Sequence, residues 1–264
     1  MEWFQALILG LVQGLTEFLP VSSSGHLVIG KEILGVEVED NVVFETVVHC
    51  ATVLSTITIL RKEIWALLKG LFDFKWNTET QYLAKICFSM IPIFIVGIFL
   101  KDYVEGLFGE GIILVGCMLL VTALLLSLTH LVRFKQKKEI GWGSAFVIGL
   151  AQALAVLPGL SRSGTTIATG LFLGVKKDEV AKFSFLMVLV PILGECFLGV
   201  IGGDFSAVAT GIPFFSLFCG FVAAYISGCL ACKWMIEIVK RANLLWFAGY
   251  CAVVAIIALI FGLC

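Results

Sequence analysis

The sequence predicts an all-α polytopic membrane protein, on the basis of its composition, its long apolar stretches and an internal repeat. Of the 264 residues, 60% are hydrophobic and only 14% are charged, and the mean hydropathy is +1.06. These values are far from those of a soluble domain. Several apolar stretches are long enough to cross a hydrocarbon core of about 30 Å, which takes about 20 helical residues. They lack the alternation of a transmembrane β-strand, so each is predicted to be a helix.

The first residues of the chain are expected to belong to the mature protein. Residues 1–19 have neither the basic start nor the small-residue cleavage site of a removable signal peptide, and they contain Glu2, Gln13 and Glu17. The formal net charge is −1, and no basic stripe is interleaved with aromatic residues. We therefore expect no nucleic-acid partner.

The chain contains two copies of one unit, offset by 139 residues. This register pairs Gln13 with Gln152 and aligns the Ser- and Gly-containing run 22–25 with 161–164. Matches between leucines arise by chance in an apolar chain, but a shared Gln together with two Ser and several Gly does not. We predict a single integral membrane domain over residues 1–264, made of repeat one (about 1–134) and repeat two (about 140–264).

Each copy is predicted to begin with a re-entrant helix pair. Its first apolar stretch, 3–19 or 144–157, ends in a loop rich in Pro and Ser, and the short apolar piece that follows cannot span a bilayer. Non-helical backbone at membrane depth is tolerated only where protein or water satisfies its polar groups, so each loop is expected to line a cavity. Three transmembrane helices then follow in each copy, at 42–60, 83–100 and 111–132 and at 181–202, 212–234 and 243–263.

The distribution of charge predicts the orientation. One side of this layout receives Arg61, Lys62, Lys69, Lys75, Arg133, Lys135, Lys137, Lys138, Lys176, Lys177, Lys240 and Arg241. The other side receives Lys31 and Lys101 with Glu37, Glu39, Asp40, Glu105, Glu110 and Asp204. By the positive-inside rule the first side is cytoplasmic, and both termini are outside. Three spans is an odd number, so the second repeat is inverted, and the two polar loops should meet near mid-depth.

The first loop carries a candidate acid–base group. Gln13 and Glu17 are four residues apart and share a helix face, while Ser23 and His26 follow Pro20. An ionisable Glu within an apolar segment costs about 3 kcal/mol on insertion scales, so it normally faces a cavity and a partner. The alternative is a Glu at the membrane edge that only solvates the helix end.

The second loop carries a candidate phosphate-binding group. Arg162 is a permanent, fork-shaped cation flanked by the hydroxyls of Ser161 and Ser163, and glycines lie on both sides. A helix that starts here would add unpaired N–H groups, and together these suit a phosphate or pyrophosphate. The alternative is a structural Arg that pairs only with Glu17.

Both loops resemble a known family. Gln13-x-x-x-Glu17 with Ser23 and His26, and the run 158–166 (PGLSRSGTT), are similar to the (E/Q)xxxE and PGxSRSxxT motifs of undecaprenyl-diphosphate phosphatases of the bacitracin-resistance type. The resemblance covers nearly the whole chain, without a departure in either motif. It implies hydrolysis of undecaprenyl diphosphate to undecaprenyl phosphate and inorganic phosphate, which recycles the carrier lipid for peptidoglycan synthesis and confers bacitracin resistance.

The resemblance also implies a location, partners and functional residues. The location is the bacterial inner (plasma) membrane, and the partners are the lipid bilayer, a polyprenyl diphosphate and a divalent cation, Mg²⁺ or Ca²⁺. By position, the functional residues are Glu17, Ser23, His26, Ser161, Arg162 and Thr166, with Gln13 as the permitted alternative to Glu.

Each of these residues can be given a physical role. Arg162 would hold the phosphate oxygens, aided by Ser161, Ser163 and Thr166. Glu17 and Gln13 would ligate the metal, or Glu17 would act as a base. The nucleophile stays open between Ser23 activated by His26, His26 itself and a metal-activated water.

Four further points concern a second polar pair, the alternative function, the side on which the site opens and the oligomeric state. Glu45 and His49, four residues apart, could extend the site, but we favour a buried pair in which each satisfies the other. A transporter or flippase of polyprenyl phosphates is the alternative function, because inverted repeats with broken helices also build secondary transporters. The site is expected to open outward, where the first loop enters. The oligomeric state is open, with a homodimer as one option.

Overall fold

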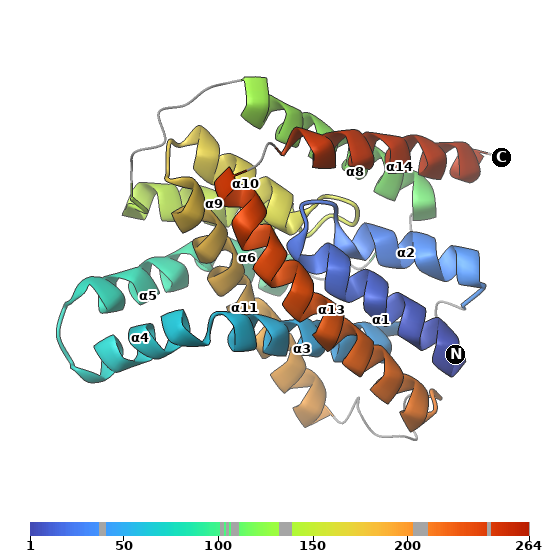
Figure 1. Cartoon of the computed structure of the whole chain (residues 1–264), viewed down its shortest axis with the longest axis horizontal. Coiled ribbons are helices and arrows are strands. Elements are labelled where there is room, and N and C mark those ends of the chain that lie inside the picture. Colours follow the sequence, from blue (N-terminus) through green and yellow to red (C-terminus); the bar gives the residue numbers. More distant parts are fainter. Residues whose placement is uncertain are drawn as a thin grey trace.

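The chain folds into helices alone. The computed structural model describes residues 1–36, 41–100, 103, 106, 111–131, 139–202, 211–241 and 244–263, and this part of the chain contains no strand. The helices are α1 (Trp3–Phe18), α2 (Ser23–Leu34), α3 (Asn41–Ile59), α4 (Arg61–Phe72), α5 (Thr78–Ser89), α6 (Ile91–Phe99), α8 (Gly111–Leu131), α9 (Trp142–Leu154), α10 (Arg162–Phe172), α11 (Lys177–Gly202), α13 (Phe214–Arg241) and α14 (Leu245–Leu263). The predicted all-α class is confirmed for these residues (Figure 1).

Several helices are long and apolar enough to cross a membrane. By length and composition there are four within the described residues: Thr78–Phe99 (α5 with α6), Gly111–Leu131, Phe214–Val239 and Leu245–Leu263. A fifth is added if α3 and α4, which are bent by 77° at the break between them, count as one span. The protein is therefore a multi-pass membrane protein. The span predicted at 181–202 falls in α11, where most side chains beyond Gly194 lie outside the described residues.

The two predicted loops end in the same kind of helix cap. Ser22 precedes α2 and Ser161 precedes α10, and each caps its helix. The Oγ of Ser22 accepts a hydrogen bond from the backbone N–H of Gly25 at 3.3 Å, and that of Ser161 accepts one from Gly164 at 3.1 Å. Such caps satisfy N–H groups that have no partner within the helix. The shared cap follows the register of 139 residues seen in the sequence, although the backbone φ angle is +70° at Ser22 and −63° at Ser161.

The two loops also lie against each other. The Oγ of Ser163 donates a hydrogen bond to the backbone oxygen of Leu19 at 3.0 Å. A Cβ added to Gly25 would lie 3.2 Å from the Cα of Gly159, which is tighter than an ordinary van der Waals contact. In Figure 1 the loop after α9 reaches the turn between α1 and α2. The expectation that the two polar loops meet is confirmed.

Close helix crossings hold the loops in place. Helix α1 packs along α13, and a Cβ added to Gly10 would lie only 2.3 Å from the backbone oxygen of Gly220. Near the loops, the rings of Phe18 and Phe185 meet edge to face with centroids 5.6 Å apart, inside the main hydrophobic core. Helices α8 and α14 pack together beside the loops. The end of α1 is therefore fixed against α10 and α11.

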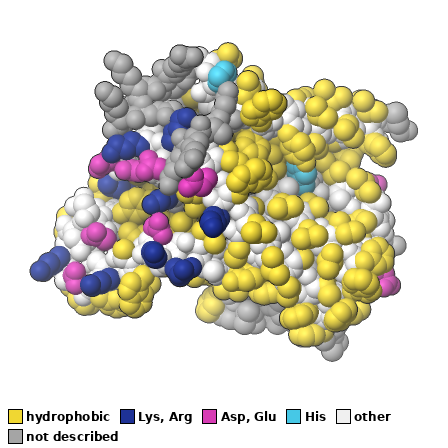
Figure 2. All heavy atoms as spheres, viewed as in Figure 1, with side chains coloured by type: hydrophobic (Ala, Val, Ile, Leu, Met, Phe, Trp, Pro, Cys, Tyr) yellow, Lys and Arg dark blue, Asp and Glu magenta, His cyan; other side chains and the backbone are white. Residues whose placement is uncertain are grey.

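The two ends of the molecule differ. Figure 1 places the start of α1 and the end of α14 at the same end of the long axis, with the α4–α5 hairpin at the other. At the first end, Ser216 Oγ donates to the backbone oxygen of Met1, and Gln5 Nε2 donates to that of Leu34. Figure 2 shows charged side chains gathered mainly over the α4–α5 end and hydrophobic ones over most of the remaining face.

The hairpin end brings together segments that the charge pattern assigns to the cytoplasm. A cavity of about 350 Å³ there is lined by residues of α4, α5 and α11 and by Glu139 and Ile140. Several charged residues on which the predicted orientation depends lie outside the described residues. They are Glu37, Glu39, Asp40, Lys101, Glu105, Glu110, Arg133, Lys135, Lys137, Lys138 and Asp204.

The crossing of α1 and α13 yields a stability prediction. Gly10→Ala should destabilise the fold, because its Cβ would meet backbone atoms that cannot move aside without separating the helices, an overpacking cost of about 1–3 kcal/mol. Gly97→Ala in α6 is the matched control, since a Cβ there meets nothing within 4 Å. Thermal unfolding in detergent should show a lower Tm for Gly10→Ala only. Equal Tm values for the two variants would contradict this packing.

Candidate active site

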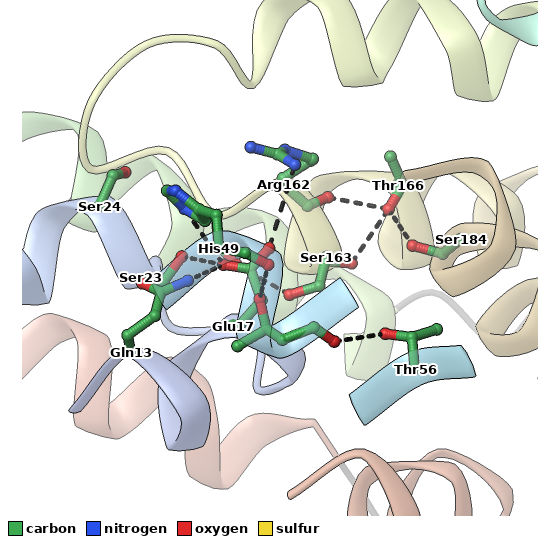
Figure 3. A network of polar contacts seen from close by, with 12 residues as sticks. Gln13, Glu17, Ser23, Ser24, His49, Thr56, Arg162, Ser163, Thr166 and Ser184 are labelled. Atoms are coloured by element: carbon green, nitrogen blue, oxygen red, sulfur yellow. Dashed lines mark hydrogen bonds and ion pairs between the residues drawn. The ribbon is translucent and has the colours of Figure 1, made fainter. Parts of the chain in front are cut away.

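The carboxylate of Glu17 is the centre of a polar cluster at the end of α1 (Figure 3). Only 8% of this side chain is exposed. Its Oε2 accepts a hydrogen bond from Gln13 Nε2 at 2.9 Å and another from Ser23 Oγ at 2.6 Å. Gln13 and Glu17 therefore share a helix face, as the spacing predicts. The Glu has the cavity and partners expected of a buried acid, rather than merely solvating a helix end.

Two positively ionisable groups approach the same carboxylate from other helices. Nη1 of Arg162, at the start of α10, lies 4.0 Å from Oε1 of Glu17, and Nε2 of His49, on α3, lies 3.8 Å from Oε2. The Arg162 side chain is 34% exposed, and no hydrogen bond joins its guanidinium to any described residue. Arg162 thus keeps its donors available for another anion, which disfavours a purely structural pairing with Glu17.

The hydroxyls of the second loop mostly brace the loop itself. The backbone N–H of Ser161 donates to Thr122 Oγ1 at 3.0 Å, and Ser161 Oγ caps α10. Thr166 Oγ1 lies 2.8 Å from the backbone oxygen of Arg162 and 2.6 Å from Ser184 Oγ, which ties α10 to α11. The structure therefore brings Arg162 and Ser163 to the cluster and uses Ser161 and Thr166 to hold them there.

A small cavity adjoins the cluster. Its volume is about 20 Å³, room for roughly one water molecule. It is lined by Glu17, Phe18, Thr52, Val53, Thr56, Arg162, Ser163, Ser184, Phe185, Val188 and Ile192. Polar groups of α1, α3, α10 and α11 thus face a wall of apolar side chains. That combination suits an amphiphile with an anionic head group. Binding one requires the lining side chains to move apart, because the cavity has room for roughly one water molecule.

His26 lies apart from the cluster. Its Nε2 is 2.8 Å from the hydroxyl of Tyr250 on α14, and the two rings stack with centroids 5.5 Å apart. Its Nδ1 is 2.8 Å from the backbone oxygen of Ser22. Ser23 donates to Glu17 instead. The pairing of Ser23 with His26 as its base, which the sequence left open, is therefore not the arrangement in this structure.

The atoms around Glu17 offer oxygen ligands to a hard cation. Gln13 Oε1 is buried without a hydrogen-bond partner beside the Glu17 carboxylate, and Mg²⁺ and Ca²⁺ prefer such oxygens. Among the described residues, no group of three or more His, Cys, Asp or Glu side chains could hold a metal ion. The protein thus supplies two candidate ligands here, and a bound cation would need further oxygens from elsewhere.

Several residues of the site were not predicted from the sequence. Glu45 forms an ion pair with Lys31, while His49 faces Glu17, so the expected Glu45–His49 pair is wrong. The reason is that α1 brings the Glu17 carboxylate to His49, while α2 brings the Lys31 ammonium to Glu45. Thr52, Thr56, Ser184 and Tyr250 also belong to the site or its surroundings. A polar side chain within a predicted span was the only signal in the sequence for these residues.

The chain is similar to known proteins over nearly its whole length. The family model of bacitracin resistance protein BacA matches residues 6–257, which include both loops of the cluster. Relatives named undecaprenyl-diphosphatase include one from Bacteroides fragilis, 59% identical over 98% of both chains, and one from Parabacteroides distasonis, 57% identical over 98% of both. Another, from Christiangramia forsetii, is 49% identical over 99% of both chains.

The open donors of Arg162 predict that the cluster binds a multivalent phosphate. Inorganic pyrophosphate with Mg²⁺ should raise the Tm of the purified protein. At a pyrophosphate concentration of 100 times its Kd, the folded state should be stabilised by about 2.7 kcal/mol. Arg162→Ala should abolish the shift. Arg61→Ala, at the exposed start of α4, should leave it unchanged. A shift that survives in Arg162→Ala would show that pyrophosphate binds elsewhere.

Proposed function

The chain belongs to the family of bacitracin resistance protein BacA, and we propose that it is an integral membrane phosphatase that hydrolyses undecaprenyl diphosphate to undecaprenyl phosphate and inorganic phosphate. The observation that carries the mechanism is a buried carboxylate, Glu17, bonded to the Ser23 hydroxyl and facing the open guanidinium of Arg162. A transporter or flippase needs no such pairing of hydroxyl and base, and the relatives are named as enzymes. The reaction returns the carrier lipid to peptidoglycan synthesis, and this recycling underlies bacitracin resistance.

Arg162 is the main phosphate-binding residue in this proposal. Phosphoryl transfer places charge on the oxygens of the transferred group, and a fixed cation stabilises that charge. The guanidinium has free donors and sits at the first residue of α10, where the helix N-terminus also favours an anion. Ser163 lines the same cavity. Ser161 and Thr166 contribute by holding this helix start in position.

Ser23 is the nucleophile that the contacts favour. Its Oγ lies 2.6 Å from Glu17 Oε2, the reach expected between a nucleophile and its base. Ser23 Oγ would attack the terminal phosphorus, its proton would pass to Glu17, and undecaprenyl phosphate would leave. Glu17 would hand this proton to the departing undecaprenyl phosphate and become ionised again. It would then accept a proton from the water that hydrolyses the phosphoserine and return it to Ser23 Oγ, releasing inorganic phosphate. His26 is a weaker candidate for the nucleophile because both of its ring nitrogens already have partners. A metal-activated water is also weaker, because a mechanism with that nucleophile assigns no role to the hydrogen bond between Ser23 and Glu17.

A divalent cation, Mg²⁺ or Ca²⁺, is part of the proposal. Bound to the diphosphate, it would neutralise charge on the phosphate oxygens. Glu17 and the unpartnered Oε1 of Gln13 would hold it together with oxygens of the substrate, because Mg²⁺ often relies on one or two protein ligands and on phosphates.

The proposed topology is two inverted repeats in the bacterial inner membrane, with both termini and the site facing outside. The matching caps at Ser22 and Ser161 and the position of both chain ends opposite the α4–α5 hairpin support it. The hairpin carries Arg61, Lys62 and Lys69, as a cytoplasmic end should. The polyprenyl tail would enter from the side, through the bilayer, since only the head group is polar. The number of chains in the assembly remains open, a homodimer included.

Arg162→Ala should leave the protein folded and reduce turnover of undecaprenyl diphosphate at least 100-fold, since one charge-stabilising donor is worth about 3 kcal/mol in the transition state. Lysine at this position should restore little, because it lacks the planar fork of donors. The measurement is inorganic-phosphate release by purified protein in detergent with Mg²⁺. Turnover above a tenth of wild type in Arg162→Ala would refute the assignment, and no release by the wild-type protein would favour the transporter.

The orientation makes a separate prediction. Sealed right-side-out vesicles should hydrolyse a membrane-impermeant, water-soluble diphosphate analogue as fast as permeabilised ones, because a diphosphate head group does not cross the hydrocarbon core. Vesicles with Arg162→Ala give the background rate. Hydrolysis only after permeabilisation would place the site on the cytoplasmic side.

A further inference from the structure

His49 is a buried histidine with little to hold it in place apart from Glu17. Its side chain is only 14% exposed, and its Nδ1 is buried without a hydrogen-bond partner. A buried polar atom left without a partner destabilises a protein, so an apolar residue would serve packing better at this position. The contact that remains is the one between Nε2 and Oε2 of Glu17, at 3.8 Å.

This contact is longer than a hydrogen bond, and the carboxylate oxygen already has two donors. Gln13 and Ser23 lie at 2.9 and 2.6 Å from the same Oε2. Once Ser23 has passed its proton to Glu17 and its oxygen is bonded to phosphorus, Ser23 can no longer donate to the carboxylate. When its hydrogen bond is lost, the imidazole of His49 is the nearest group on the α3 side that can take its place.

The burial of Nδ1 indicates which ring nitrogen carries the proton. An unpartnered N–H is less tolerated in a protein interior than an unpartnered acceptor. The neutral ring with its proton on Nε2 therefore leaves a bare acceptor at Nδ1 and directs an N–H toward Glu17. Each tautomer makes one nitrogen a donor and the other an acceptor.

We propose that His49 is a positioning residue for Glu17: its Nε2–H holds the carboxylate in line while Ser23 carries the phosphoryl group and has no proton to donate to Glu17. This inference rests on the proposed function, in which Ser23 is the nucleophile and Glu17 its base. It adds His49 as a third residue, which orients the base. That order, in which a further residue orients the base, is the general logic of activated nucleophiles. His49 touches neither the phosphate nor the metal in this scheme.

Two amide substitutions test the proposal. The side-chain nitrogen of Gln reaches the position of Nε2, whereas that of Asn reaches only the position of Nδ1. His49→Asn should lower kcat for undecaprenyl diphosphate by about tenfold or more, the usual effect of losing a hydrogen bond to a charged group, with KM little changed. His49→Gln should keep at least a third of the wild-type kcat. His130→Leu, at the exposed end of α8, is the control for the loss of a histidine as such.

Thermal unfolding of each variant separates a folding defect from a catalytic one, and the Asn and Gln variants should melt alike. The proposal is overturned if His49→Asn keeps more than half of the wild-type kcat, or if Asn and Gln at this position are equally impaired. Parallel assays of Ser23→Ala and Arg162→Ala distinguish the two failures. If those variants are inactive while His49→Asn is not, only the role of His49 is wrong; if they stay active, the proposed function itself fails.

Discussion

The buried carboxylate of Glu17 is the constraint on which the rest of the structure depends. An ionised carboxylate taken out of water costs far more than a protein can tolerate unless donors and positive charge surround it. Here the donors come from separate helices: Gln13 from α1, Ser23 from α2, His49 from α3 and Arg162 from α10. Burying this one group therefore requires both loops and both halves of the chain to meet at one point.

In the loop around Arg162, some side chains stabilise the loop and another is available to bind phosphate. The hydroxyls of Ser161, Ser163 and Thr166 bond to the backbone or to neighbouring helices, which fixes the start of α10. Arg162 keeps its guanidinium donors free and remains one-third exposed, with Glu17 on one side of it and the cavity on the other. A rigid support and an open cation are what stabilisation of phosphate charge requires, because the donors need not reorganise during the reaction.

Whether a contact could be predicted from the sequence depends on how far apart its two partners lie along the chain. The contact between Gln13 and Glu17 and the caps at both loops are local, so helix spacing and residue type were sufficient. The partner of His26 is 224 residues away on α14, and the partner of His49 depends on how α3 packs beside α1. Neither is encoded in a short motif. The apolar stretches predicted the positions of most helices, but the 77° bend between α3 and α4 falls at Leu60, where neither proline nor glycine marks it in the sequence.

A double-mutant cycle between Glu17 and Arg162 tests most directly whether the two halves of the chain form one active site. The measurement is kcat/KM for undecaprenyl diphosphate with Glu17→Gln, Arg162→Ala and the double variant, each checked for folding. If the two residues act as a unit, the double variant should be little worse than the worse single one, because removing either already disables the site. Losses that multiply would mean that Glu17 and Arg162 act independently, and the account of a composite site would be wrong.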